Sequence, residues 1–260
     1  MTRTSVAYLT RPLERSSLRF TRNDSGGTSP LITAPGAADE DFVWGGPGGT
    51  TFTGKQPDIS NFPAGIFQLS SDKWDEVTQL TFSNRKLTAF AIERLLTKLT
   101  VLASLNIQTN TGLLEDVSGW VLPATLSTMY LSNTNLSGNI SGWVLPTTLT
   151  SLQSYSTNLS GDVSGWVLPA ILIYLYLHST NIDYGAGGMM ATATRNASTY
   201  FFQNCALAQA EVDAILADAD ASATTNSTLN VAGTNAAPSG GAGNANYLAL
   251  LGKGWTVTIS

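Results

Sequence analysis

Apolar residues recur along the middle of the chain at a fixed long spacing. The segment Ser-Gly-Trp-Val-Leu-Pro occurs at 118–123, 141–146 and 164–169, with an offset of 23 residues each time. Between the copies runs a second pattern, in which mostly apolar residues stand at relative positions 1, 4, 6 and 11 and Thr stands at position 9. Repetition with a period of about 20 to 50 residues is typical of architectures in which each unit packs on the next.

Short strands are predicted where this second pattern alternates. An apolar-x-apolar segment directs its apolar side chains to one face, so the fourth position of the pattern marks the centre of a half-buried strand. The chain contains six such centres, in turns of 23 to 25 residues, at Leu80, Leu105, Met129, Leu152, Leu175 and Tyr200. A single turn cannot bury its own apolar residues, so the turns are expected to stack.

The pattern resembles the leucine-rich-repeat family, whose frame is L-x-x-L-x-L-x-x-N-x-L. The pieces Leu-Ser-Gly at 136–138 and 159–161 resemble the plant-type subclass of that family. The phrases at 229–239 and 252–258 resemble the C-terminal cap of leucine-rich-repeat proteins encoded by bacteriophages and some marine bacteria. Together these features predict an α/β repeat solenoid, mostly β, of about six turns, with a β-rich N-terminal domain and a helix-plus-strand C-terminal cap.

Four segments are predicted from the changes in pattern. They are an extended N-terminal arm at 1–35, a small β-rich anchoring domain at 36–75, the repeats at 76–207 and the C-terminal cap at 208–260. Apolar spacing predicts helices at 90–98 and 209–217, and a final strand at 255–259.

Two further columns of the repeat have structural interpretations. The ninth position of the frame normally bonds to exposed backbone inside the turn, and here it holds Asn110, Thr134, Thr157, Thr180 and Cys205. Cys205 is therefore predicted to be a buried repeat residue rather than a reactive thiol. The three tryptophans of the Ser-Gly-Trp segments, one per turn, are predicted to stack on the convex side, away from the strands.

Composition excludes several classes of function. Only 12% of the 260 residues are charged, about half the usual share, whereas 33 are Thr and 26 are Ser. A net charge of −5 argues against nucleic acid and against anionic lipid as partners. The longest apolar runs, such as 167–176, are too short for membrane insertion, and the first 20 residues do not resemble a secretory signal. One Cys and one His exclude an internal disulfide and the common metal sites, so no metal or cofactor is expected.

One surface could carry function. In the resembled fold the x positions of the strands face outward from the concave sheet, and aromatic residues gather there toward the last turns. The candidate ligand- or partner-binding residues are Tyr130, Tyr155, Tyr174, Tyr176, His178 and Phe201. Rings beside hydroxyl and amide groups suit a host surface glycan or protein. The alternative interpretation is that cross-strand Tyr and Thr pairs only stabilise the sheet. No catalytic residue is predicted.

The resemblance implies a function as well as a fold. It implies a non-enzymatic structural protein of a bacteriophage virion, a homo-oligomer anchored to other virion proteins through its N-terminal region. The repeats would then project for host-cell recognition at the tail. Two alternatives remain open, a capsid decoration or head-fibre protein and a bacterial secreted or surface adhesin.

Overall fold

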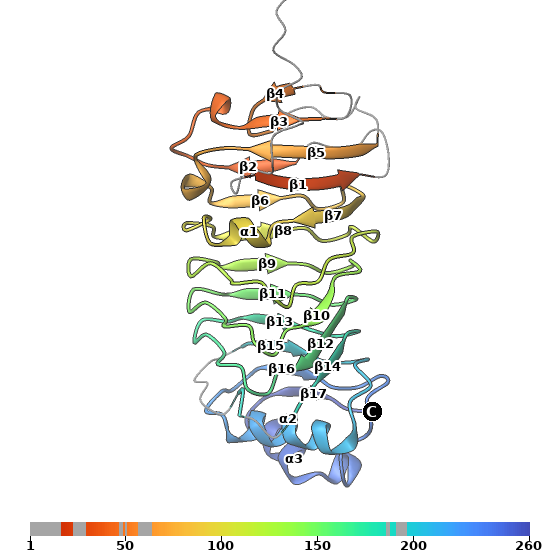
Figure 1. Cartoon of the computed structure of the whole chain (residues 1–260). Coiled ribbons are helices and arrows are strands. Elements are labelled where there is room, and N and C mark those ends of the chain that lie inside the picture. Colours follow the sequence, from red (N-terminus) through yellow and green to blue (C-terminus); the bar gives the residue numbers. More distant parts are fainter. Residues whose placement is uncertain are drawn as a thin grey trace, which may run out of the picture.

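The computed structural model describes residues 17–22, 30–46, 49, 51–56, 64–185, 188–190 and 197–260. These residues form three β-sheets and three α-helices. The elements are stacked along one axis, with a sheet of N-terminal strands at one end and helices α2 and α3 at the other (Figure 1).

The main sheet contains nine strands, each three residues long. In spatial order these are β2 (Leu31–Thr33), β6 (Gln79–Thr81), β8 (Ser104–Asn106), β9 (Thr128–Tyr130), β11 (Ser151–Gln153), β13 (Tyr174–Tyr176), β15 (Thr199–Phe201), β16 (Thr228–Asn230) and β17 (Thr256–Thr258). All neighbours pair in parallel except β2 and β6, which are antiparallel.

The strands are in register, so that their central side chains form one buried column. Leu80 pairs with Leu105, and the column continues through Met129, Leu152, Leu175, Tyr200 and Leu229. Each of these residues is at most 1% exposed. The centres predicted from the sequence are the middle residues of β6, β8, β9, β11, β13 and β15. A three-residue strand directs only this one side chain inward, so each strand depends on its neighbours for burial.

The predicted fold class, an α/β repeat solenoid of about six turns, is wrong. The described chain is a mostly-β fold of several sheets, and its three α-helices contain only 4, 13 and 8 residues. The leucine pattern specifies the short strands, but Gly and Pro in the connecting segments prevent those segments from forming helices. The main sheet also continues beyond the six predicted strands, through β2 at one end and through β16 and β17 at the other.

A second, three-stranded parallel sheet lies beside the main one. It consists of β10 (Ser137–Asn139), β12 (Asn158–Asp162) and β14 (Asn181–Asp183). Gly161 has a φ of +105°, and a Cβ there would overlap the side-chain oxygen of Asn139 in the preceding turn. That oxygen already accepts a hydrogen bond from the Ser141 backbone N–H at 2.9 Å. Glycine in the Leu-Ser-Gly piece is therefore required by backbone conformation and by close packing.

The N-terminal strands form an antiparallel sheet of their own. Its spatial order is β4 (Thr51–Thr53), β3 (Val43–Gly45), β5 (Gly65–Ser70), β1 (Ser17–Arg22) and β7 (Leu87–Ala91). Phe20 on β1 stacks on Phe67 of β5, with ring centroids 5.3 Å apart, and meets Phe82 edge-on at 5.2 Å. These rings join the sheet to the core of the repeats. The predicted helix at 90–98 is shorter in the structure, because residues 90–91 belong to β7 and α1 covers only Glu93–Leu96.

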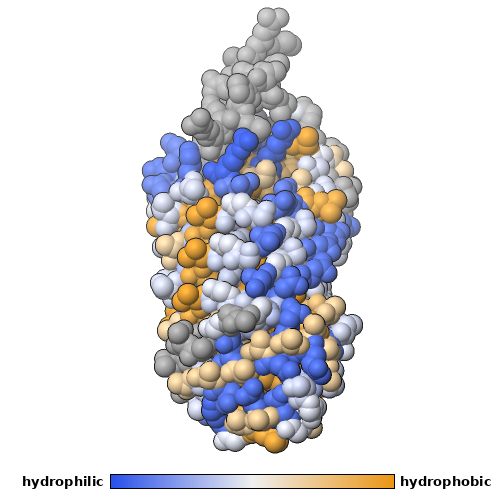
Figure 2. All heavy atoms as spheres, turned by 60° about the horizontal axis from the view of Figure 1, so that its bottom comes forward, coloured by the Kyte–Doolittle hydropathy of each residue, from blue (hydrophilic) through white to orange (hydrophobic). Residues whose placement is uncertain are grey.

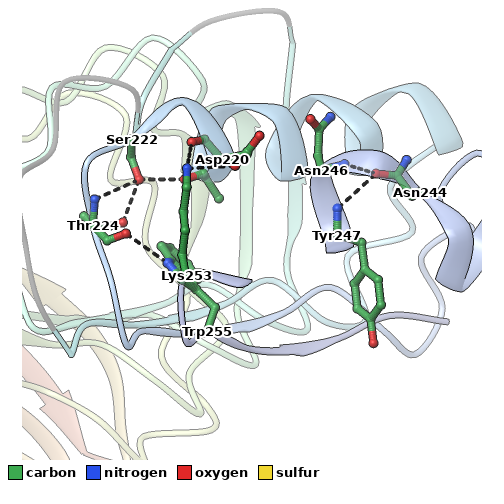
Figure 3. A network of polar contacts seen from close by, with 9 residues as sticks. Asp220, Ser222, Thr224, Asn244, Asn246, Tyr247, Lys253 and Trp255 are labelled. Carbon is green, nitrogen blue, oxygen red and sulfur yellow. Dashed lines mark hydrogen bonds and ion pairs between the residues drawn. The ribbon is translucent and has the colours of Figure 1, made fainter. Parts of the chain in front are cut away.

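Two helices close the other end of the stack, α2 (Gln209–Ala221) and α3 (Ala245–Gly252). A polar network ties them together (Figure 3). Lys253 forms an ion pair with Asp220 at 2.7 Å, and Trp255 donates its indole N–H to the Thr224 carbonyl at 3.1 Å. The Asn244 side chain caps α3 by accepting from the Asn246 and Tyr247 N–H groups.

The turn after each strand is held by one buried side chain per repeat. Thr134, Thr157 and Thr180 each donate to the carbonyl three residues earlier, at 2.5 to 2.7 Å. In the first and last turns of this set the residue is Asn, at Asn110 and Asn235, and its side-chain amide bonds to backbone groups of its own turn and of the preceding turn.

Two predictions about the packing of the repeats are confirmed. Cys205 is a buried repeat residue, and its thiol contacts the Leu177 carbonyl at 3.3 Å. Burial raises the pKa of this thiol, which keeps it protonated. Trp120, Trp143 and Trp166 form a buried stack with ring centroids 6.4 and 6.5 Å apart. The indole N–H groups of the last two donate to carbonyls of the preceding repeat.

The close packing at Gly161 gives a first prediction. Gly161→Ala should lower the free energy of unfolding by about 1–3 kcal/mol, because Ala must adopt a positive φ and displace Asn139. Gly142→Ala is the matched control, since a Cβ at Gly142 meets nothing within 4 Å and its φ is not positive. The control should be neutral or slightly stabilising. Urea denaturation of both variants measures the difference, and equal effects would contradict the packing argument.

The Asn column gives a second prediction. Asn235 is 4% exposed and makes four hydrogen bonds, two from its amide N–H groups and two to its oxygen. Asn235→Ala leaves four buried backbone groups without partners, so it should cost more than about 2 kcal/mol. Thr157→Val removes a single such bond and should cost about 1 kcal/mol. Thermal unfolding compares the two, and an Asn235→Ala variant as stable as Thr157→Val would be inconsistent with this role.

Candidate functional site

The outer face of the main sheet brings five of the six candidate residues together. Tyr174 and Tyr176 lie on β13, Tyr155 and His178 follow β11 and β13, and Phe201 ends β15. Tyr155 stacks on His178 at 4.5 Å with the ring planes 7° apart, and Tyr176 stacks on Phe201 at 4.7 Å and 13°. Edge contacts join Tyr174 to Tyr176 at 5.7 Å and His178 to Phe201 at 6.0 Å. We call these five residues the aromatic cluster.

Tyr130 does not join the aromatic cluster. It ends β9 on the same face, where it pairs with Gln153 of β11. Gln153 in turn pairs with Tyr176, so one polar residue separates Tyr130 from the nearest ring of the cluster. Five of the six predicted residues therefore form a cluster of rings in contact. The sixth, Tyr130, lies on the same face but β11 separates its strand from β13.

The stacking limits which parts of the rings a ligand could reach. In each stacked pair the two rings cover one face of each other. Such contacts between neighbouring strands stabilise the sheet, which was the alternative interpretation of these residues. Tyr174 differs, because 42% of its surface remains exposed. The cluster thus combines a packed aromatic base with one exposed ring.

Two polar atoms in this region lack partners. His178 Nδ1 and Gln203 Oε1 are buried and have no hydrogen-bond partner among the residues that the structure describes. Gln203 lies one turn after His178 in the same outward column, but the predicted site included only the aromatic members of that column and His178. Native proteins rarely leave such atoms unsatisfied. The buried Ser154 Oγ, beside Tyr155 in the chain, is in the same condition, so the feature extends beneath the rings into the core.

Burial sets the protonation of the cluster. It lowers the pKa of His178, which favours the neutral imidazole, and it raises the pKa of the Tyr176 phenol. Charged groups are also distant along the chain, because the segments 117–161 and 163–182 contain no Asp, Glu, Lys or Arg. The cluster therefore presents neutral hydrogen-bonding groups on an uncharged part of the sheet.

In-register stacking arranges side chains of one kind in rows along the molecule. On the face shown in Figure 2, hydrophobic residues form a lengthwise row beside rows of neutral and hydrophilic ones. Each row arises because equivalent positions of successive turns lie side by side. An extended ligand or partner could therefore meet the same chemistry at several turns.

Comparison with known proteins adds no relative. No family model matches the chain, and neither a curated protein nor a solved structure is similar to it at a significant level. Within the described ranges, no helix is long and apolar enough to span a membrane. The same part of the chain holds no group of three or more His, Cys, Asp or Glu side chains placed to bind a metal ion.

His178 gives a third prediction, which is directly measurable because the chain contains one histidine. Its ring proton should titrate in NMR with a pKa below the ordinary 6.5, because burial penalises the imidazolium. The unfolded chain then binds this proton more readily than the folded one. The contribution of His178 to stability is therefore complete above pH 6.5 and falls as the pH drops through the folded pKa.

The matched variant for this titration is His178→Gln. In this variant the loss of stability that His178 causes below pH 6.5 should be absent, whereas the pH dependence that other groups contribute should be unchanged. A titration at or above 6.5 in the folded protein would contradict the burial of the ring.

Proposed function

We propose that this chain is a non-enzymatic virion protein of a bacteriophage that recognises a glycan on the host cell surface through the aromatic cluster. The observation that carries the proposal is the gathering of Tyr155, Tyr174, Tyr176, His178 and Phe201 on one uncharged face. The assignment to a virion rests on the resemblance of the repeats and of the C-terminal phrases to phage-encoded proteins.

The chemistry of the cluster fits a neutral sugar. An exposed ring such as Tyr174 can cover the apolar face of a pyranose, and phenol, amide and hydroxyl groups nearby can bond to its hydroxyls. Gln153 and Thr199, which flank Tyr176 and Tyr174 on the neighbouring strands, supply such groups.

His178 supports binding rather than catalysis in this proposal. Its ring is stacked on Tyr155 and touches Phe201 edge-on, which makes it part of the packed base of the cluster. A neutral imidazole in that position can still donate or accept one hydrogen bond.

The fourth prediction tests this function with labelled full-length chain on a glycan array and on intact bacteria. Tyr174→Ala should reduce binding by at least about tenfold, which corresponds to the loss of about 1.4 kcal/mol of contact. Tyr176→Phe removes only a hydroxyl and keeps the stack on Phe201, so it should cause a smaller loss. Leu248→Ala on α3 is the control, because Leu248 is similarly exposed but distant in the fold, and it should bind as the unaltered chain does.

Two outcomes would contradict the proposal. Binding that Tyr174→Ala leaves unchanged would place recognition on another surface. An absence of binding to every glycan and cell tested would reject recognition and favour the structural alternative, a decoration protein of the capsid.

A further inference from the structure

One row of outward side chains runs without a break across the main sheet from β6 to β17. The third residue of each strand pairs in register with the third residue of the next strand (Figure 1). In spatial order these residues are Thr81, Asn106, Tyr130, Gln153, Tyr176, Phe201, Asn230 and Thr258. We call them the outer row. Each is half-buried or exposed, so the whole row lies at the surface.

Amide and aromatic side chains alternate in the outer row between β8 and β13. Asn106 is followed by Tyr130, and Gln153 is followed by Tyr176. The amide–ring pair thus occurs twice, with a period of two strands, or about 10 Å at the usual strand spacing. Tyr130, which lies outside the aromatic cluster, is therefore the ring of the first pair, and Tyr176 in the cluster is the ring of the second.

The strands that carry the outer row have no charged residue. The eight strands from β6 to β17 in the main sheet contain no Asp, Glu, Lys or Arg, although the chain has 13 Lys or Arg and 18 Asp or Glu residues. A ligand with carboxylate, sulfate or phosphate groups would find no cation on these strands to pair with. The outer row therefore fits a neutral ligand.

The spacing of the outer row fits a chain of sugars. Adjacent strands lie about 4.8 Å apart, which is comparable to the length of one pyranose unit in an extended polysaccharide. A polysaccharide that crosses the strands along the axis of the stack therefore places successive sugars over successive strands. Because rings cover the apolar faces of sugars and amides bond to hydroxyls, each amide–ring pair can receive two neighbouring sugars.

We propose that the outer row binds a linear, uncharged polysaccharide, which lies along the axis of the stack with two successive sugars over each amide–ring pair. This inference rests on the proposed glycan recognition and narrows its ligand to one class. Short fragments bind at the aromatic cluster, where Tyr174 and Tyr176 lie together. Asn106 and Tyr130 contact only fragments that are long enough to reach them from the cluster.

The fifth prediction concerns the length of the ligand. The probes are fragments, from disaccharides to octasaccharides, made by partial acid hydrolysis of the surface polysaccharide of a bacterium that binds the labelled chain. Isothermal titration calorimetry on the full chain should show an affinity at least about tenfold higher for hexasaccharides than for disaccharides, because more of the outer row is covered. The hexasaccharide affinity should be independent of salt concentration, because no ion pairs form.

Tyr130→Thr separates the two ends of the site. Thr stands at the equivalent place in β6 and β17, so the strand can accommodate it. The variant should lower the hexasaccharide affinity about fivefold, which corresponds to about 1 kcal/mol for one aromatic contact, and should bind disaccharides as the unaltered chain does. Asn106→Ala should act in the same direction.

Two further variants serve as controls. Tyr174→Ala should weaken the binding of disaccharides and hexasaccharides alike, because both contact the aromatic cluster. Leu248→Thr on α3 should weaken neither, because Leu248 is an exposed residue outside the main sheet. Thermal unfolding of each variant checks that it is folded at the temperature of the titration.

Three results would overturn this inference while leaving glycan recognition intact. They are equal affinities for disaccharides and hexasaccharides, a hexasaccharide affinity that falls steeply with salt, and hexasaccharide binding that neither Tyr130→Thr nor Asn106→Ala weakens. An absence of binding to every bacterium and every fragment would instead reject glycan recognition, and this inference with it.

Discussion

The whole molecule depends on the burial of one central side chain per strand between two neighbouring turns. A strand of three residues makes too few hydrogen bonds to be stable alone, and it directs a single side chain inward. Register is therefore strict, because a shift by one residue would place that side chain in water. This register aligns the central side chains in one buried column from Leu80 to Leu229. The other features of the repeat stabilise the turns that connect these strands.

Three kinds of buried side chain stabilise the turns between the short strands. Buried Asn and Thr side chains bond to the backbone groups that the turns leave unpaired, and the Trp stack fills the opposite side of the core. Because these residues face inward, the outward positions are free to vary. The outward positions of the last strands carry the aromatic cluster, so the candidate site and the buried column use different side chains of the same strands.

The sequence predicted the strand centres because burial imposes a period on them. It could not predict the fold class correctly, since the pattern says nothing about where the sheet ends. Thr228-Leu-Asn and Thr256-Val-Thr have the same alternation as the repeats but lack the rest of the pattern, and β2 joins from the N-terminal side in the opposite direction.

The candidate site, too, could be predicted from the sequence only in part. The outward column identified the rings of the aromatic cluster, because alternation determines which residues face out. It did not identify the contacts among them or the unsatisfied atoms of His178 and Gln203, which depend on side-chain conformation.

We propose that the outward rings bind a host glycan while the buried column of the main sheet stays unchanged. NMR of the full chain with labelled tyrosine rings and leucine methyls tests this separation, with signals followed during addition of a glycan that binds on the array. The glycan should shift the signals of Tyr174, Tyr176 and His178 and leave those of the buried Leu152 and Leu175 in place. Shifts of the buried leucines without shifts of the rings, or no shift of the rings, would be incompatible with recognition by this face.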